Sequence, residues 1–277
     1  MGEVTRPSRD ALIALALPIA RQAAVAIQQI YKETVLAKNP QFILKSDQSP
    51  LTAADLAAHR IIEQGLRAAT PTIEVVSEEG EQDHHQDPRR LEQADFWLVD
   101  PLDGTREFLS GNGEFTVNIA FIEAGRPTLG VVCLPVTGAC YWGGAGLGAF
   151  LQFPHDDVPT PLAVNRAETS PWRVVASRSH LNEKTAALIK RLPEATLVQA
   201  GSSLKFCRIA QGQADIYPRL SPTCEWDTAA GQAVLEGAGG YVFDEQGQPL
   251  RYGKPEVLNP SFVACHRPYD EVAQWLR

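Results

Sequence analysis

The chain of 277 residues has little of what marks several common protein classes. It contains five cysteines, an odd number, with no C-x-x-C spacing, which fits a reducing compartment better than a disulfide framework. Acidic residues outnumber basic ones, 33 to 25, and the net charge is −8. This balance argues against a nucleic-acid polymer as ligand, because a phosphate backbone needs a basic face. Internal repeats and low-complexity tracts are also lacking in the sequence.

Long hydrophobic runs are lacking as well. The apolar run near the N-terminus, residues 11–20, is too short to span a membrane and is interrupted by Pro18. Its helical pattern continues to Tyr31 without a clear cleavage site, so we interpret it as the first helix of the domain and predict no integral membrane segment. With 44% hydrophobic residues, the chain can bury a large core in one compact unit of two subdomains.

The most informative feature that is present is a turn with two aspartates. An apolar strand at 97–99 leads directly into D-P-L-D-G-T at 100–105. Carboxylates three positions apart across this turn can converge on one point, and oxygen-only ligands favour Mg²⁺ or Mn²⁺ over zinc. If a helix begins after Asp103, the unpaired amides of Gly104 and Thr105 favour an anion. The alternative is a surface turn with an acidic helix cap.

Two further acidic segments lie upstream and downstream of this turn. A predicted strand at 73–76 is followed by Glu78 and Glu79, which could supply one metal ligand and one residue that holds a water or a second metal. A solvated polar loop is the alternative there. Downstream, Asp227 precedes a predicted helix of small residues at 228–237, which could approach the site closely. Its alternative is a plain N-cap aspartate.

Four motifs occur in order along the chain. They are T-A-A-D at 52–55, E-E at 78–79, D-P-L-D-G-T at 100–105 and W-D-T-A-A-G at 226–231. Together they resemble the lithium-sensitive, magnesium-dependent phosphatases of the inositol monophosphatase superfamily. G-T-R-E-F after the turn, S-R-S-H at 177–180 and S-S-L-K-F-C at 202–207 are most similar to its CysQ-type 3'(2'),5'-bisphosphate nucleotidases. The resemblance extends from residue 11 to the C-terminus and shows no departure at a metal-binding or water-activating position.

The resemblance implies roles for the residues of the acidic motifs. Asp55 and Thr105 would form a catalytic pair, in which the aspartate accepts from the threonine hydroxyl so that this hydroxyl can orient the attacking water. Glu79 would assist the second metal or its water shell. The chemistry would be in-line attack of a metal-activated water on a phosphate monoester. Each site would bind two or three Mg²⁺ ions, and Mn²⁺ could substitute. The ligands would be the main-chain carbonyl of Leu102 and the side chains of Glu78, Asp100, Asp103 and Asp227.

A pocket for the substrate is implied beside the metals. Arginine donates two parallel hydrogen bonds to phosphate oxygens, and lysine places a compact positive charge beside them, so both residue types suit a second phosphate. By themselves the residues also allow a plainer interpretation, with Lys205 and Arg219 as solvated charges and His180 as a helix cap. The residues that the resemblance places around the substrate are Gly104, Thr105, His180, Ser202, Lys205 and Arg219.

The implied reaction is hydrolysis of the 3'-phosphate of adenosine 3',5'-bisphosphate to AMP and phosphate. Conversion of 3'-phosphoadenosine 5'-phosphosulfate to adenosine 5'-phosphosulfate would be a second reaction in sulfur metabolism. An inositol monophosphatase or a related sugar phosphatase is the alternative, and it would not need a second basic site at Lys205 and Arg219. A non-enzymatic nucleotide sensor is disfavoured, because the predicted ligands and the Asp55–Thr105 pair are all present.

The same resemblance sets expectations for partners and location. The ligand would be a small-molecule nucleotide bisphosphate, with no nucleic-acid polymer as partner. The protein would be a monomer or a homodimer. We expect a cytoplasmic enzyme, and the family allows peripheral association with the inner face of the cell membrane.

The predicted elements define an α/β fold with an α+β N-terminal part, residues 1–155, and a C-terminal α/β part, residues 156–277. Residues 153–161, rich in Pro and Asp, mark the boundary. The first part contains helices at 9–32 and 53–69 and strands at 73–76, 96–99, 115–123, 128–134, 139–142 and 148–151. The second alternates strands at 173–176, 197–199, 214–217 and 263–265 with helices at 183–191, 204–211 and 228–237, which favours a more parallel sheet.

The resemblance implies how these elements are arranged. It predicts a layered αβαβα sandwich of the inositol monophosphatase and fructose bisphosphatase type, with the metals at the junction of the two parts. Cys133, Cys140 and Cys207 lie in or beside apolar elements, and we predict that they are inert core residues.

Overall fold

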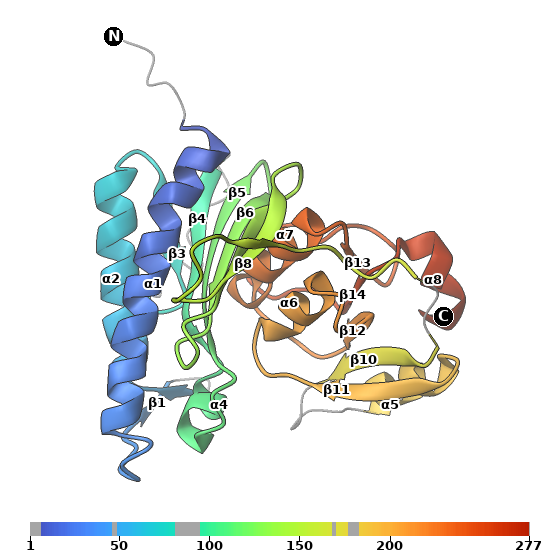
Figure 1. The fold of residues 1–277 in the computed structure, drawn as a ribbon, viewed down its shortest axis with the longest axis horizontal. Coiled ribbons are helices and arrows are strands. Elements are labelled where there is room, and N and C mark those ends of the chain that lie inside the picture. The colour runs from blue at the N-terminus through green and yellow to red at the C-terminus, as the bar shows by residue number, and fades with distance from the viewer. Residues whose placement is uncertain (1–6, 46–48, 81–94, 168–169, 177–182, 277) are drawn as a thin grey trace.

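Helices and sheets alternate in layers across the molecule (Figure 1). The structure is a computed structural model, and it describes residues 7–45, 49–80, 95–167, 170–176 and 183–276. Over these residues a helical pair, a large sheet, a second helical pair, a smaller sheet and a third helical pair follow one another. The predicted αβαβα sandwich is therefore confirmed.

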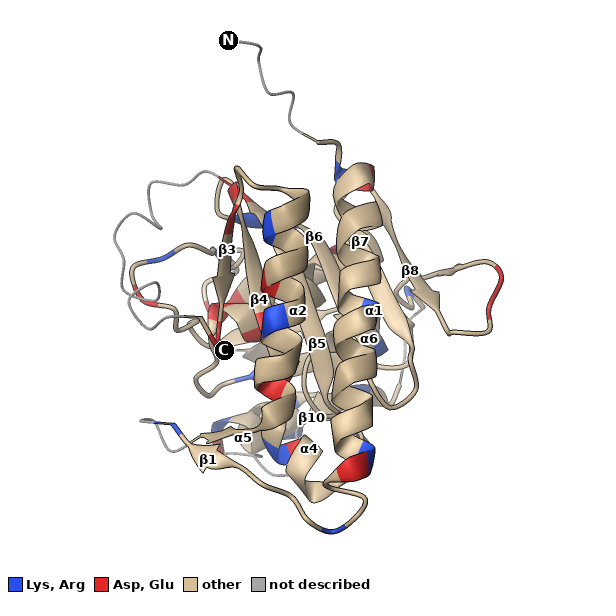
Figure 2. Cartoon of the chain, turned by 90° about the vertical axis from the view of Figure 1, so that its left-hand side faces the viewer, with Lys and Arg blue, Asp and Glu red and all other residues tan. Residues whose placement is uncertain are grey.

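The first layer consists of α1 (Arg9–Glu33) and α2 (Ala53–Ala69), which lie side by side on one face of the larger sheet (Figures 1 and 2). Each helix has a side-chain cap at its N-terminus. Ser8 accepts a hydrogen bond from the backbone of Ala11, and Thr52 and Asp55 form a reciprocal capping box on α2. Buried residues of α1 recur three or four positions apart, as one helical face requires: Leu12, Ala16, Ala20, Ala23, Ala24, Ile27 and Tyr31.

In the described part of the chain, α1 is the one helix that is long and apolar enough to cross a membrane by length and composition, with a mean hydropathy of 1.6 in its most apolar window. Its buried face packs against α2 and the larger sheet, in a core cluster that includes Leu12 and Ile27 of α1 and Ile119 and Phe121 of the sheet. Helices at the core of globular proteins have this packing. The prediction that α1 is the first helix of the domain is confirmed.

The larger sheet forms the second layer, with the strand order β3-β4-β5-β6-β7-β8-β9 over the described residues. The β3–β4 pair is parallel, and the other neighbours are antiparallel. Side chains of β5 alternate between the faces: Ile119 and Phe121 point to α1 and α2, and Ala120 and Ile122 to the opposite core. The strands are β3 (Glu74–Ser77), β4 (Asp95–Asp103), β5 (Thr116–Glu123), β6 (Arg126–Cys133), β7 (Cys140–Gly144), β8 (Gly148–Gln152) and β9 (Thr160–Pro161).

Two helices, α6 (Leu204–Ala210) and α7 (Ala229–Gly237), lie between the two sheets (Figure 1). The start of α7 crosses β6 at close range, since a Cβ at Gly130 would lie 2.2 Å from the carbonyl oxygen of Ala230. Only glycine fits there. The prediction that the small residues of this helix allow a close approach is confirmed, and the approach brings Asp227 to the sheet that carries the acidic turn.

The smaller sheet has the order β11-β10-β12-β14-β13 over the described residues. β10 is parallel to β11 and β12, whereas β14 is antiparallel to β12 and β13, so the expected parallel character holds for three of these strands. α5 (Glu183–Arg191) and α8 (Tyr269–Leu276) cover its outer face. The strands are β10 (Trp172–Ala176), β11 (Ala195–Gln199), β12 (Ile216–Arg219), β13 (Tyr241–Asp244) and β14 (Phe262–Cys265). The division of the chain at residues 155 and 156 stays a prediction.

The cysteine prediction needs a correction. Cys133 of β6 and Cys140 of β7 are directly opposite each other, with Cα atoms 4.2 Å apart, and the structure joins them in a disulfide. Both lie in the core as predicted. The preference for a reducing compartment over a disulfide framework is wrong for this pair, however, and the pair no longer supports a reducing compartment. Cys207 is buried and free as predicted, and burial raises the pKa of its thiol.

Candidate active site

The acidic turn is placed by an irregularity at the end of β4. Asp100 pairs with Asn118 on β5, but Asp103 pairs with Thr116, so three steps on β4 match two on β5. Such a bulge changes the direction of the side chains that follow it. It turns Asp103 toward the same point as Asp100, instead of toward the opposite face of the sheet. The predicted convergence of these two carboxylates is thus produced by the bulge.

Three aspartates meet at this point. Ligand atoms of Asp100, Asp103 and Asp227 lie within 4.8 Å of one another. Asp227 ends the short 3₁₀ helix η2 (Glu225–Asp227), and its Oδ2 accepts a hydrogen bond from the backbone N–H of Cys224 at 2.8 Å. It does not cap α7, so the alternative of a plain N-cap aspartate is wrong. Residues more than 120 positions apart are brought together because α7 packs onto the sheet.

Glu78 and Glu79 follow β3, which lies parallel to β4. The backbone N–H of Glu78 donates to the carbonyl oxygen of Val99 at 3.0 Å, which carries the pair to the end of β4 beside the aspartates. Lys45 forms ion pairs with both glutamates, at 2.8 Å to Glu78 and at short range to Glu79. Lys45 precedes β2 (Pro50–Leu51) in a small hairpin, and sequence analysis gave it no role.

The pKa values show that this group of carboxylates is short of positive charge. Burial and then the charges of Glu78, Asp103 and Asp227 raise the pKa of Asp100 well above its ordinary value. Burial, with Asp103 and Glu78, raises the pKa of Asp227 to about 8. Burial and Glu78 raise the pKa of Glu79 to about 7, although Lys45 opposes the shift. A bound cation would relieve this repulsion.

The donor set fits a divalent metal ion. It consists of carboxylate oxygens on a partly buried surface, and in the described part of the chain no histidine or cysteine belongs to it. Hard oxygen ligands of this kind are typical of Mg²⁺ sites. Leu102, whose carbonyl was predicted as a ligand, lies in the bulge between the two aspartates, and its N–H donates to Asp100 at 3.1 Å.

The predicted pair of Asp55 and Thr105 is formed in the structure. Thr105 Oγ1 donates to Asp55 Oδ1 at 3.2 Å. The other carboxylate oxygen, Oδ2, accepts from the backbone N–H of Thr52 at 2.7 Å and from its hydroxyl at 2.5 Å. The capping box of α2 therefore fixes one oxygen of Asp55 and leaves the other facing Thr105. Burial raises the pKa of Asp55 in spite of these hydrogen bonds.

A helix begins directly after Asp103 and Gly104, which is the condition under which anion binding was predicted, and the binding itself stays a prediction. Gly104 is in the left-handed region, with φ of 93°, and directly precedes α4 (Thr105–Ser110). A Cβ at Gly104 would lie 2.2 Å from Ser202 Oγ, so both the conformation and the space require glycine. Ser202 Oγ lies 2.8 Å from the carbonyl oxygen of Asp103 and 2.9 Å from that of Glu114. Ser202 thus holds the turn as well as bordering the pocket.

Two residues that had no predicted role connect the aspartates to each other. The backbone N–H of Ser203 donates to Asp103 Oδ2 at 2.7 Å, and its hydroxyl donates to the carbonyl oxygen of Asp227 at 2.7 Å. Asn118 Nδ2 donates to Ser203 Oγ at 2.9 Å. Ser203 stands in the S-S-L-K-F-C segment of the resemblance, but the sequence context of neither residue indicates which partners it meets.

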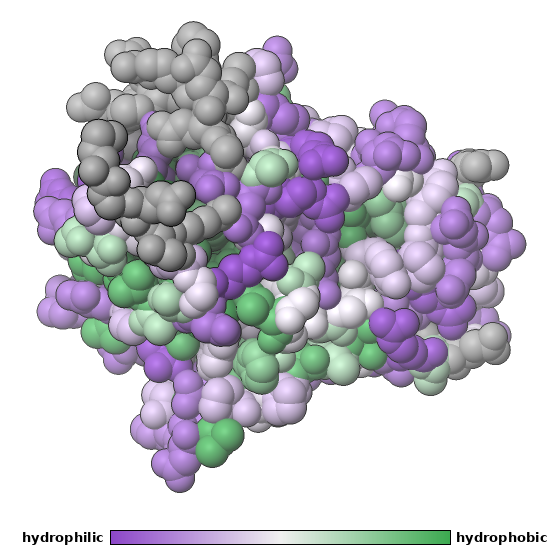
Figure 3. All heavy atoms as spheres, turned by 90° about the horizontal axis from the view of Figure 1, so that it is seen from above, coloured by the Kyte–Doolittle hydropathy of each residue, from purple (hydrophilic) through white to green (hydrophobic). Residues whose placement is uncertain are grey.

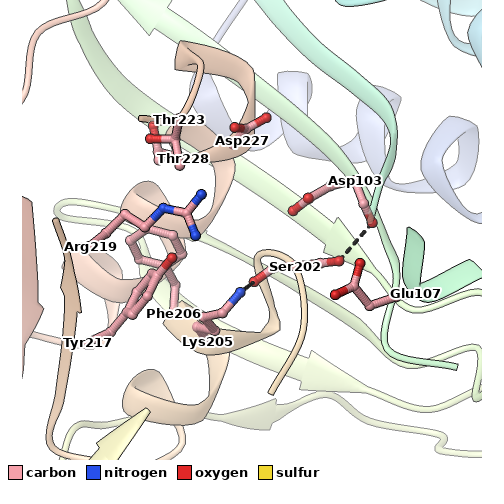
Figure 4. Close-up of a pocket in the computed structure, with 10 residues that line it drawn as sticks. All are labelled: Asp103, Glu107, Ser202, Lys205, Phe206, Tyr217, Arg219, Thr223, Asp227 and Thr228. Carbon is pink, nitrogen blue, oxygen red and sulfur yellow. Dashed lines mark hydrogen bonds between the residues drawn. The ribbon is translucent and has the colours of Figure 1, made fainter. Parts of the chain in front are cut away.

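A pocket opens beside the three aspartates (Figure 4). Its volume is about 140 Å³. Lys205 Nζ donates to the carbonyl oxygen of Ser202 at 3.0 Å and lies 5.4 Å from the ring centre of Tyr217, while Arg219 projects toward the pocket from β12. His180 lies outside the described residues. The lining residues are Asp103, Glu107, Ser202, Lys205, Phe206, Tyr217, Arg219, Thr223, Asp227 and Thr228.

A buried polar network lies behind Asp227. Gln232 Nε2 donates to Glu236 at 2.7 Å, so its carbonyl oxygen accepts from the hydroxyl of Tyr252 at 2.7 Å. Tyr252 then accepts from Thr228 at 3.1 Å. Asn259 Nδ2 donates to Thr228 Oγ1 at 2.9 Å. This chain of hydrogen bonds fixes the start of α7, which closely follows Asp227 of η2, and sequence analysis did not predict it.

Comparisons with known proteins agree with this geometry. The family model for the inositol monophosphatase family matches residues 8–274, and the chain belongs to this family. Among its relatives is the 3'(2'),5'-bisphosphate nucleotidase CysQ of Salmonella typhimurium, 45% identical over 249 residues, which are 88% of this chain and 95% of that protein. The protein of the same name from Escherichia coli K12 has the same identity and coverage.

Solved structures give the same result. The crystal structure of CysQ from Bacteroides thetaiotaomicron, a bacterial member of the inositol monophosphatase family, matches with a TM-score of 0.79 and 36% identity, over 94% of this chain and 98% of that one. The extragenic suppressor protein SuhB of Bartonella henselae matches with a TM-score of 0.76 and 23% identity, over 96% and 98% of the two chains. At that identity the second likeness concerns the fold alone.

Proposed function

We propose that the chain is a metal-dependent 3'(2'),5'-bisphosphate nucleotidase, which hydrolyses the 3'-phosphate of adenosine 3',5'-bisphosphate to AMP and phosphate. The observation that carries the proposal is the pocket beside three converging carboxylates, two of which, Asp103 and Asp227, line it together with the cations Lys205 and Arg219. The carboxylates suit metal ions, and the cations suit a second phosphate on the substrate. The names of the relatives at 45% identity support the same activity. Hydrolysis of 3'-phosphoadenosine 5'-phosphosulfate is a second reaction of the same kind.

Mg²⁺ is the metal that we assign to the site, with Mn²⁺ as a substitute. Glu78, Asp100, Asp103, Asp227 and the carbonyl of Leu102 would hold the ions. When bound, the ions would lower the pKa of a water molecule and neutralise charge on the phosphate. The number of ions, two or three per site, belongs to the proposal.

The residues of the chain itself orient the reaction. Thr105 donates its hydroxyl hydrogen to Asp55, so its oxygen remains free to accept a hydrogen bond from the attacking water. The backbone amides at the start of α4 would face the reacting phosphate and bind its oxygens. Glu79, whose pKa is raised to about 7, can take up a proton near neutral pH and would assist the water shell.

Lys205 and Arg219 would bind the phosphate that is not cleaved. The side chain of Lys205 is held by the carbonyl oxygen of Ser202 and the ring of Tyr217, which leaves its charge at the pocket. Arg219 donates to the carbonyl oxygens of Ser221 and Pro222 at 3.3 and 3.1 Å, which orients its guanidinium. These two cations favour a bisphosphate over an inositol monophosphate, whose single phosphate is used at the metals. His180 is assigned to the same pocket by resemblance only.

Phosphate release in the presence of Mg²⁺ tests the proposal. Adenosine 3',5'-bisphosphate, inositol 1-phosphate and fructose 1,6-bisphosphate are compared side by side, with Asp100→Asn as the inactive control. A preference for the nucleotide that this substitution abolishes is the expected result. Equal or faster turnover of the inositol or sugar substrate would preserve the metal chemistry and refute the nucleotide specificity.

Location and assembly are also part of the proposal. We place the enzyme in the cytoplasm without an integral membrane segment, because the apolar face of α1 is used to pack the core. Peripheral association with the inner face of the cell membrane belongs to the same proposal. On the face seen in Figure 3, hydrophilic and hydrophobic residues are interspersed over the described part of the chain, as on a surface in contact with water. Size-exclusion chromatography with light scattering distinguishes a monomer from a homodimer.

A further inference from the structure

One carboxylate in the pocket has no place in the metal site. Glu107, the third residue of α4, borders the pocket beside Ser202, and Lys205 and Arg219 come from the opposite side (Figure 4). A negative charge is unfavourable in a pocket for an anionic substrate, unless it meets a neutral hydrogen-bond donor of that substrate. Local features that oppose the general charge of a site often mark a function.

The position of Glu107 is fixed by its surroundings. A Cβ at Gly104 would lie 3.2 Å from its Oε2, and a Cβ at Gly201 would lie 3.1 Å from its Cγ. The side chain therefore packs over two glycines, one of which is the phosphate-binding turn. Its carbonyl oxygen accepts from the backbone N–H of Asn112 at 3.3 Å and from Ser110 Oγ at 3.1 Å, which anchors the backbone. The carboxylate is thus held about one helical turn from the predicted position of the reacting phosphate.

In the described part of the chain, no protein group donates a hydrogen bond to the carboxylate of Glu107 and no cation forms an ion pair with it. Its charge acts toward the metal site, because it contributes to raising the pKa of Asp103 after the larger effect of burial. A half-buried carboxylate that faces a substrate pocket without a partner is suited to accept a hydrogen bond from the ligand.

We propose that Glu107 is a specificity-determining residue, whose carboxylate accepts a hydrogen bond from a neutral donor on the nucleoside part of the substrate. This inference rests on the proposed nucleotidase activity. Both phosphates of such a substrate are acceptors, so only a hydroxyl or an amino group can donate to Glu107. The two sources on an adenine nucleotide are the 2'-hydroxyl of the ribose, next to the reacting 3'-oxygen, and the amino group of the base.

Three substrates separate the two sources. Phosphate release is measured from adenosine 3',5'-bisphosphate, from its 2'-deoxy analogue and from inosine 3',5'-bisphosphate, which lacks the exocyclic amino group. A hydrogen bond to a charged group corresponds to a loss of roughly tenfold to a hundredfold in kcat/KM when its donor is removed. A lower kcat/KM for the deoxy analogue identifies the 2'-hydroxyl as the donor to Glu107. A lower kcat/KM for inosine 3',5'-bisphosphate identifies the amino group as the donor.

The same measurements on Glu107→Ala and Glu107→Gln complete the test. Glu107→Ala should lower kcat/KM for adenosine 3',5'-bisphosphate to the value for the poorer analogue, mainly by raising KM. The kcat/KM for that analogue should stay nearly unchanged. Glu107→Gln keeps the shape and loses the charge, so it should retain part of the discrimination. Glu183→Gln, in the exposed first turn of α5, is the matched control and should behave as the unmodified protein.

Two outcomes would overturn the inference separately from the activity. The unmodified protein could cleave all three nucleotides with equal kcat/KM. Alternatively, Glu107→Ala could lower kcat/KM for all three nucleotides by one common factor, as a purely structural defect would. In both cases the nucleotidase activity stands and the role of Glu107 fails. If the unmodified protein cleaves none of the nucleotides, the proposed function fails, and the inference with it.

Discussion

Buried carboxylates occur in two contrasting regions of this molecule. Asp215, with a fully buried side chain under the smaller sheet, accepts three hydrogen bonds from Arg173: 2.7 Å from the backbone N–H, 3.0 Å from Nε and 2.6 Å from Nη2. Burial acts to raise the pKa of Asp215, but these hydrogen bonds outweigh it and the pKa is lowered. Among the described residues, no cation lies as close to Asp100 or Asp227 as Arg173 does to Asp215. The pKa values of Asp100 and Asp227 are raised.

The comparison shows how a stable fold tolerates a strained site. Carboxylates that serve the structure are supplied with donors from the chain itself, as Asp215 is by Arg173. The three aspartates of the acidic cluster accept hydrogen bonds from backbone N–H groups, but among the described residues no cation forms an ion pair with them. Each charge therefore destabilises its neighbours until an external cation binds. Free energy from the rest of the fold offsets that repulsion, for example from the buried Trp97, whose indole N–H donates to Thr70 at 3.0 Å.

The largest effect is expected from removing one carboxylate of the acidic cluster, Asp100. Asp100→Asn should lower kcat/KM for adenosine 3',5'-bisphosphate by roughly a thousandfold, because a bound ion supplies several kcal/mol of transition-state stabilisation. The same substitution should raise the melting temperature of the metal-free protein, since it removes one of the repelling charges. Steady-state kinetics and thermal unfolding in EDTA check the two effects.

The control is Asp95→Asn, which makes the same change at the other end of β4 and should preserve activity. If Asp100→Asn keeps activity within a factor of about ten, the assignment of Asp100 as a metal ligand is wrong.

The two regions should also respond to pH with opposite signs. The pKa of Asp227 is raised from 3.8 to about 8, so the folded metal-free protein binds protons more tightly than the unfolded chain. The stabilisation that comes from protonated Asp227 is fully present below the pKa of Asp227 in the unfolded chain. It is lost as the pH rises through the pKa of Asp227 in the folded protein. The free energy of unfolding in EDTA should therefore fall between about pH 4 and about pH 8, by about 1 kcal/mol per pH unit for each group that titrates.

Saturating Mg²⁺ should remove this fall, because metal ions bind the ionised carboxylates. Asp215 has the opposite pH dependence, because its pKa is lowered by folding. The stabilisation from ionised Asp215 is present above its pKa in the unfolded chain and is lost as the pH falls through its pKa in the folded protein. Urea unfolding at a series of pH values, with and without Mg²⁺, measures both. A stability in EDTA that does not change over the neutral range would contradict the proposed repulsion.

Removing the cation of the structural region should affect stability and leave the chemistry intact. Arg173→Met leaves Asp215 buried without its partner, and we expect a loss of about 3 kcal/mol in the free energy of unfolding. The remaining folded protein should keep its kcat. The double variant Arg173→Met/Asp215→Leu should recover part of the loss, and failure to recover any of it would mean that the ion pair is not the cause.

The smallest effect is expected from the network behind Asp227. Tyr252→Phe removes the hydroxyl that links Gln232 to Thr228, and should lower the free energy of unfolding by about 1 kcal/mol. Because this network holds the start of α7, more Mg²⁺ should be needed for half-maximal activity. Tyr241→Phe, at a partly exposed tyrosine, is the control. Equal metal requirements in the two variants would exclude a positioning role for Tyr252.

The sequence predicted the metal site better than the surroundings of the site. The acidic motifs, the glycine of the turn and the Asp55–Thr105 pair are local patterns or ordered motifs, and the structure brings them together. Lys45, Ser203 and Asn118 had no predicted partners, because the contacts of each join segments far apart in the chain. The Cys133–Cys140 disulfide was not predicted, since a count of cysteines does not reveal which strands are adjacent.

By itself, the amino-acid sequence determined the alternation of helices and strands and the motifs that carry the acidic residues of the site. These follow from hydrophobic periodicity and from backbone sterics, which act over a few residues. The tertiary structure alone decided that Asp227 meets Asp100 within 4.8 Å and that Glu107 faces Lys205 across a pocket. Such contacts depend on how the layers pack, and packing is settled by the burial of surface from the whole chain.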